Sequence, residues 1–262
     1  MPNYIDQTGR EVEVVAFPKR IVSLVPSQTE LLASLGLEAE VVGITKFCIH
    51  PEEWFRSKTR IGGTKNLRID LIRQLKPDLI LANKEENKLE QIEMLEDYPV
   101  WASDVNDLAS ALQMIEEIGK MTGKTVEANY LLSQIQSAFQ TLGRPTTTKS
   151  VLYFIWYQPW MAASSNTFIN DMLSRLGFEN LASQFGDRYP VIPTVKLKDL
   201  APDYILLSSE PFPFNQKHVD ELQERFPHAT ILLVDGSLFS WYGSRLLNSP
   251  TYFKQQFGNQ FI

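Results

Sequence analysis

The segments that decide the fold are LKPDLILA at residues 75–82 and LAPDYILL at residues 200–207. In each, a Pro-Asp turn leads into a short apolar run, which is typical of a buried strand. A second pair precedes them in the same order: ELLASLGLE at residues 30–38 and DMLSRLGFE at residues 171–179. In both of these, a glycine follows a helical pattern and is expected to end the helix. Because the two pairs recur in one order, the sequence predicts two related lobes.

Around these segments, short β-branched runs alternate with helical patterns, which predicts an α/β fold with largely parallel sheets. One helix is expected to begin at a capping box formed by Ser27 and Glu30 and to end at Gly36. Two further helices are expected at residues 107–118 and 124–142, followed by a turn at 143–148. The predicted strands are residues 21–25, 41–45, 79–82 and 100–102, then 151–156, 204–208 and 231–234, with an edge strand at 12–15.

Length and composition limit the class of protein. The chain has 262 residues, enough for two moderate domains, and its 44% hydrophobic and 21% charged residues are typical of a folded globular protein. Its longest apolar stretch, residues 151–163, is shorter than the roughly 20 residues that span a bilayer. The net charge of −6, without a basic cluster, argues against nucleic acid as a partner. The single cysteine excludes an internal disulfide, and residues 1–6 do not resemble an export signal.

Residues just after the strands of the first half are candidates for a ligand site, because parallel sheets bind ligands beyond the carboxyl ends of their strands. Cys48 and His50 follow one such strand two positions apart, a pair that suits a soft metal or haem iron. Two alternatives stay open: a buried cysteine beside a hydrogen-bonded histidine, and a Cys-His nucleophile. Asn83 and Asn87 follow the next strand and are expected to contact a ligand.

In the second half, aromatic residues gather at two strand ends. The first group is Trp156, Tyr157 and Trp160. Rings of this kind stack on flat conjugated ligands, and core packing is the alternative use for them. After the last predicted strand come Trp241, Tyr242 and Arg245, whose guanidinium can hold a carboxylate bidentately or brace a hinge. None of these segments contains an acid–base pair or a triad, so no enzyme is predicted.

Several segments together resemble the substrate-binding proteins of ABC importers for cobalamin, haem and siderophores. They are RIVSLVPS at residues 20–27, Thr29 with Glu30, VGIT at 42–45, LKPDLI at 75–80 and WYGSR at 241–245. The resemblance implies two Rossmann-like lobes with largely parallel sheets, joined by one long α-helix, with the ligand cleft between the lobes and little hinge closure. The implied boundaries are 1–122 for the N-terminal lobe, 123–143 for the connecting helix and 144–262 for the C-terminal lobe.

The resemblance also implies a function. The protein is expected to capture a metal chelate without transforming it, as a monomer with no intrinsic cofactor, in the periplasm or on the outer face of the inner membrane. Asp70 and Asp199 correspond to the acidic residues with which family members dock onto an ABC permease. Two alternatives remain open: a cytoplasmic carrier or sensor of a tetrapyrrole or metal complex, and a two-lobed α/β enzyme that uses Cys48 or His50.

The identity of the ligand is less fixed than the fold. Cobalamin binders of the family place tryptophan where this chain has Thr64, Asn83 and Ile192, so haem and an iron-siderophore stay beside cobalamin as options. Cys48 and His50 are the candidate metal ligands. The predicted ligand-binding residues are Phe47, Cys48, His50, Thr64, Asn83, Asn87, Trp156, Tyr157, Trp160, Tyr189, Trp241, Tyr242 and Arg245.

Overall fold

A five-stranded parallel sheet with the order β5–β4–β3–β8–β9 forms the centre of the first half of the chain. The structure is a computed structural model that describes residues 1–143 and 145–258. The strands of this sheet are β3 (Ile21–Ser23), β4 (Val41–Ile44), β5 (Thr59–Arg60), β8 (Leu79–Asn83) and β9 (Val100–Ser103). The apolar runs at residues 21–25, 41–45, 79–82 and 100–102 therefore contain strands, as predicted. These strands are apolar because both faces of a parallel sheet are covered.

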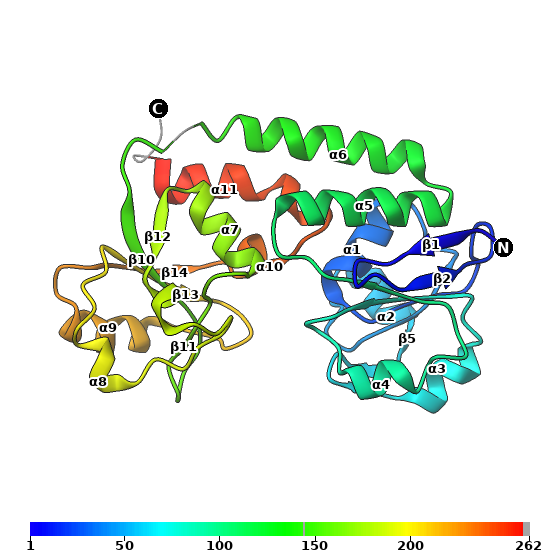
Figure 1. The fold of residues 1–262 in the computed structure, drawn as a ribbon, viewed down its shortest axis with the longest axis horizontal. Helices are drawn as coiled ribbons and strands as arrows, with labels where there is room; N and C mark the ends of the chain where they lie inside the picture. Colours follow the sequence, from blue (N-terminus) through cyan, green and yellow to red (C-terminus); the bar gives the residue numbers. More distant parts are fainter. Residues whose placement is uncertain (144, 259–262) are drawn as a thin grey trace. The chain divides into compact units, whose positions relative to one another are not determined.

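Helices cover both faces of the first sheet (Figure 1). Helices α1 (Pro26–Ser34) and α5 (Leu108–Thr122) lie on one face, while α3 (Ile69–Leu75) and α4 (Leu89–Glu93) lie on the other. Leu75 packs so closely on Gly43 of β4 that a Cβ at Gly43 would lie 2.7 Å from it. The remaining elements of this half are β1 (Asn3–Ile5), β2 (Glu11–Glu13), α2 (Glu52–Ser57), β6 (Gly62–Gly63) and β7 (Asn66–Leu67).

The second half of the chain forms another sheet, with the order β11–β10–β13–β14 and with β12 also paired to β10. All of its pairs are parallel except β10 with β11. Its strands are β10 (Lys149–Trp156), β11 (Met161–Ala162), β12 (Phe178–Asn180), β13 (Tyr204–Ser208) and β14 (Thr230–Val234). Its helices are α7 (Phe168–Arg175), η1 (Leu181–Phe185), α8 (Thr194–Leu197), α9 (Gln216–Arg225), α10 (Ser237–Ser240) and α11 (Ser249–Phe257). The largely parallel α/β architecture is confirmed in both halves.

The chain divides into two compact units. The first contains Met1–Val105, Ala109–Gln136 and Trp241–Leu247, the last of which includes the short helix η2 (Ser244–Leu247). The second unit contains Asn106–Leu108, Ser137–Ser240 and the residues from Asn248 onward, so the boundary between the units falls within α6 (Thr125–Gln140), after Gln136. Helix α6 runs back along α5, and Gly119 provides the close approach, since a Cβ there would lie 2.4 Å from the Ala128 side chain. In the predicted turn at 143–148, Arg144 lies outside the described residues.

The repeated sequence segments have matching structures. Asp78 accepts hydrogen bonds of 2.7 Å from the backbone N–H groups of Lys19 and Arg20, which precede β3. Asp203 accepts a 2.8 Å bond from the backbone N–H of Ser150, near the start of β10. Each aspartate thus ties one strand of its sheet to the start of the neighbouring strand. The glycines of the other pair, Gly36 and Gly177, end α1 and α7 with φ of +72° and +76°.

Two predictions about local structure are wrong. Helix α1 begins at Pro26, one residue before the predicted capping box, and its N-cap residue Val25 makes no capping side-chain bond. Proline lacks an N–H and has a φ suited to the first helical position, so the helix begins there and Ser27 falls within its first turn. The bounds predicted for the edge strand, 12–15, are also wrong, because β2 ends at Glu13; it pairs with β1 in a separate two-stranded sheet.

In the described part of the chain, no helix is long and apolar enough to cross a membrane.

Candidate functional site

A buried polar network lies at the carboxyl edge of the first sheet. The backbone N–H of Asn83 donates to Asn87 Oδ1 at 2.9 Å, and Asn87 Nδ2 donates to the Thr64 carbonyl oxygen at 3.0 Å. Asn83 Nδ2 donates to Ser103 Oγ at 2.9 Å. The structure thus brings Thr64, Asn83 and Asn87 together. All three are buried, and the two asparagine side chains connect the loops at this edge to one another.

Cys48 lies in the core beneath this edge. Its side chain is fully buried, Thr29 Oγ1 donates to its sulfur at 3.1 Å, and Thr45 Oγ1 lies at the same distance. Burial raises the pKa of the Cys48 thiol, so the sulfur stays protonated and inert. His50 is exposed, so the structure separates the two residues of the predicted metal pair. Among the described residues, no three His, Cys, Asp or Glu side chains form a group that could hold a metal ion.

His50, Trp241 and Arg245 come together in the first unit, and Glu30 completes the group. Arg245 holds Glu30 bidentately, with Nε 2.8 Å from Oε2 and Nη2 3.0 Å from Oε1. The same guanidinium lies 4.4 Å from the centroid of the Trp241 ring. The His50 ring meets Trp241 edge-on, with 6.1 Å between the centroids. Arg245 therefore holds a carboxylate, as its sequence position suggested, but that carboxylate belongs to the chain itself.

The backbone of the Trp241–Leu247 segment lies directly against α1. A Cβ at Gly243 would lie 2.8 Å from the carbonyl oxygen of Ser27, so this approach requires glycine. Since α1 follows β3, Trp241 is held at the same sheet edge as the loop after β4, where Phe47 and Ile49 are half exposed. Tyr242, in contrast, is buried.

The second unit has an aromatic cluster at the carboxyl edge of its own sheet. Trp156 and Phe212, which follow the parallel strands β10 and β13, meet edge-on with ring centroids 5.7 Å apart. Tyr157 lies 4.9 Å from Trp160 and 4.8 Å from His218. Of the three predicted aromatic residues, Trp156 is exposed, Tyr157 is half-buried and Trp160 is buried. Trp160 therefore packs in the core, whereas the exposed Trp156 ring of the same cluster is open to contact from outside.

Two polar contacts fix the orientation of this cluster. The Tyr157 hydroxyl donates to Glu221 Oε2 at 2.8 Å, and this bond raises the pKa of Tyr157. Tyr157 is therefore a neutral phenol at neutral pH. His218 is buried and accepts a 3.1 Å bond at Nδ1 from the backbone N–H of Asn215. Both side chains hold the rings in place through hydrogen bonds.

Two other predicted residues in the second unit lie elsewhere. Tyr189 is half-buried in the loop that precedes α8. Ile192, where cobalamin binders of the family place tryptophan, is buried in the core and donates its backbone N–H to the Trp160 carbonyl oxygen at 2.8 Å. Its side chain supports the aromatic cluster from within.

Sequence reasoning missed five residues of these surfaces: Glu30, Phe212, Phe214, His218 and Gly243. The Pro-Phe-Pro-Phe segment at residues 211–214 was a usable signal, because it places two aromatic residues just after a predicted strand. Glu30 carried no such signal, since its partner Arg245 lies 215 positions away.

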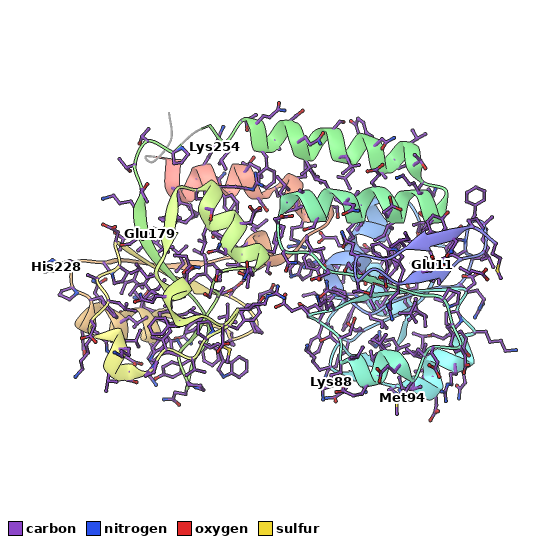
Figure 2. All side chains as sticks on the ribbon, in the orientation of Figure 1. Glu11, Lys88, Met94, Glu179, His228 and Lys254 are labelled. Carbon is purple, nitrogen blue, oxygen red and sulfur yellow. The ribbon has the colours of Figure 1, made fainter. Side chains whose placement is uncertain are left out.

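The two acidic residues with a predicted docking role are both exposed. Asp70 lies in the first turn of α3 and lines a surface pocket with Leu67, Leu71 and Met94. Met94 projects outward beside this pocket and is labelled in Figure 2. Asp199 follows α8 in the second unit.

Together these features define a class of protein: two α/β units, each with aromatic side chains at the carboxyl edge of a parallel sheet. The chain belongs to the periplasmic binding protein family, whose model matches residues 21–229. That family is one of binding proteins and not of enzymes, as the sequence predicted.

Individual relatives agree with this assignment. The uncharacterized ABC transporter substrate-binding lipoprotein YvrC of Bacillus subtilis (strain 168) is 30% identical over 190 residues, which cover 68% of this chain and 60% of that protein. A vitamin B12-binding protein of Pectobacterium carotovorum is 23% identical over 75% of this chain and 73% of its own length. The periplasmic haem-binding protein RhuT of Roseiflexus sp. RS-1 shares the fold, with a TM-score of 0.76, 20% identity, and coverage of 90% of this chain and 98% of RhuT.

Proposed function

We propose that this protein is the substrate-binding component of an ABC importer and that it captures a metal chelate, of the cobalamin or haem type, without transforming it. The observation that carries the proposal is the pair of aromatic surfaces, with Trp241 at the sheet edge of the first unit and Trp156 at that of the second. A flat conjugated macrocycle stacks well on such rings. Relatives named for vitamin B12 and haem support this class of ligand.

The proposed mode of binding is stacking, with the metal held by the chelate itself. Of the two candidate metal ligands, Cys48 is buried with a raised pKa and His50 is exposed, while the Tyr157 phenol, whose pKa is also raised, donates to Glu221. A phenol or a thiol that keeps its proton is a poor metal ligand. The enzyme alternative loses Cys48 as its nucleophile for the same reason.

A visible absorption titration of the purified protein with cyanocobalamin and with haemin tests this function. We expect one of the two chelates to bind saturably at one per chain, with a band shift, and to stay bound through gel filtration. If both chelates elute free from the protein and shift no band, the proposed ligand class is wrong.

We further propose that Asp70 and Asp199 dock the loaded protein onto basic pockets of the permease on the outer face of the inner membrane. Both are exposed, and the pocket beside Asp70 is lined by Leu67, Leu71 and Met94 together with Arg68 and Arg73. Reversing either charge, in D70K or D199K, is expected to lower transport at least tenfold and leave chelate affinity unchanged, since a like charge would face each basic pocket.

The matched controls for these variants reverse the charge of an exposed acid elsewhere on the same unit. Glu11 serves for the first unit and Glu179 for the second, and both are labelled in Figure 2. If E11K and E179K lower transport as much as D70K and D199K do, the effect is one of general surface charge and the docking assignment is wrong.

A further inference from the structure

We propose that Glu30 and Arg245 are positioning residues that fix the Trp241 ring as a stacking face for an uncharged, conjugated part of the ligand. In this arrangement Arg245 is not a receptor for a ligand carboxylate. The inference rests on the proposed function and deepens it, because it states what the first unit recognises.

In this group, the ion pair of Glu30 and Arg245 holds the ring of Trp241. Arg245 uses two nitrogens on the two oxygens of Glu30, at 2.8 and 3.0 Å, which fixes the plane of the guanidinium. Arg245 Cζ lies 4.4 Å from the Trp241 centroid, where a cation is attracted to the ring face. The side chains of Arg245 and Glu30 are only 18% and 25% exposed, so water screens the pair weakly. One face of the Trp241 ring therefore lies against the guanidinium of the ion pair.

The fold also fixes where Glu30, Arg245 and Trp241 lie. Glu30 lies on α1, one turn beyond Ser27, and Gly243 allows the Trp241–Leu247 segment to approach the Ser27 carbonyl oxygen. His50 contacts the ring edge-on and is exposed, as is Phe47 in the same loop. The face that this group offers is thus aromatic, and the Lys46 ammonium lies 5.0 Å from the centroid of the Phe47 ring beside it.

The charges of the group decide what kind of ligand it suits. The Arg245 cation is neutralised by Glu30 at hydrogen-bonding distance, so the pair attracts an anionic ligand group weakly. A conjugated ring system gains by stacking on Trp241 without any charge of its own. We therefore expect contacts here to come from the macrocycle and not from peripheral carboxylates.

Replacement of Glu30 separates the two roles of Arg245. In E30Q the side chain keeps its shape and loses its charge, which leaves the Arg245 cation uncompensated. If Arg245 positions Trp241, E30Q and R245K are both expected to weaken binding of cyanocobalamin or haemin, whichever the wild type binds, by about tenfold, because the stacking face is loosened. If Arg245 instead binds a ligand carboxylate, E30Q is expected to strengthen binding of haemin, which carries two carboxylates. Such a gain would overturn the inference.

A measurement without ligand keeps the proposal testable if neither chelate binds. Protein labelled with 5-fluorotryptophan has five tryptophan positions, and W241F assigns the ¹⁹F resonance of Trp241. E30Q and R245K are expected to shift and broaden that resonance. A Trp241 resonance unchanged in both variants overturns the positioning role, whatever the outcome for ligand binding.

The chain offers a matched control for the arginine. Arg175 contacts Asp171 with Nε 2.8 Å from Oδ2, and its guanidinium lies 5.9 Å from the Phe139 ring, in the second unit. R175K is expected to leave chelate affinity and the Trp241 resonance as in the wild type. If the wild type binds neither chelate, the proposed function fails. If the wild type binds a chelate and E30Q and R245K bind it equally well, only the positioning inference is refuted.

Discussion

The environment of Cys48 determines what a single residue of this protein can do. Its thiol is fully buried, and burial raises its pKa, so it should be protonated and shielded from reagents at pH 8. We expect a disulfide reagent such as DTNB to leave the native protein unmodified for an hour and to react at once with the urea-unfolded chain. The affinity of C48A for its chelate should stay within about twofold of the wild type, a ratio of less than 0.5 kcal/mol. Rapid modification of the native thiol, or loss of binding in C48A, would show that Cys48 belongs to the site.

At this scale the sequence could propose residue types but not their directions. Cys48 and His50 are two positions apart in the loop after β4, yet one is buried and the other exposed, because the loop turns and Thr29 and Thr45 surround the sulfur. The role of Glu30 depends on Arg245 from the far end of the chain. Such partners are set by tertiary packing, which a local pattern does not contain.

Among the secondary-structure elements, the two Pro-Asp turns make the same connection in the two sheets. The pKa of Asp203 is lowered, first by the backbone N–H of Ser150 and then by the Ser150 hydroxyl. A carboxyl group with a lower pKa in the folded state stabilises the fold above its unfolded pKa of about 3.9. This contribution is lost as the pH falls through the lower, folded pKa.

D203N is therefore expected to lower the free energy of unfolding by about 1 kcal/mol at pH 7, the usual value for one such hydrogen bond. The difference from the wild type should begin to shrink below about pH 4, where the carboxyl group of the unfolded chain becomes protonated, and should disappear below the lower, folded pKa. Urea unfolding at pH 7 and pH 3 measures both values. The exposed Asp187 provides the control, D187N. An equal loss of stability in D203N at both pH values would rule out the carboxylate as the cause.

Elements were predicted well where the signal was local. The core strands of both sheets and helices α5 and α6 follow from apolar periods and turn residues within a few positions. The predicted capping box failed because Pro26 begins the helix one residue earlier and Glu30 bonds to a distant arginine. The aromatic cluster was half predicted: Trp156, Tyr157 and Trp160 follow one strand, while Phe212 and Phe214 reach them from another.

For the whole molecule, we propose that a conjugated metal chelate stacks on aromatic side chains at the carboxyl edge of the sheet of an α/β unit. The first unit presents the half-buried Trp241 there, and the second presents the exposed Trp156. Their truncation to alanine removes a stacking face and little of the core, whereas Trp54 and Trp101 are buried and structural.

The most direct test is the absorption titration repeated with W156A and W241A on the chelate that the wild type binds. We predict that each variant stays folded and loses affinity by at least tenfold, about 1.4 kcal/mol per ring removed. If both variants bind the chelate as tightly as the wild type, the ligand does not use these aromatic surfaces and the account of the site is contradicted.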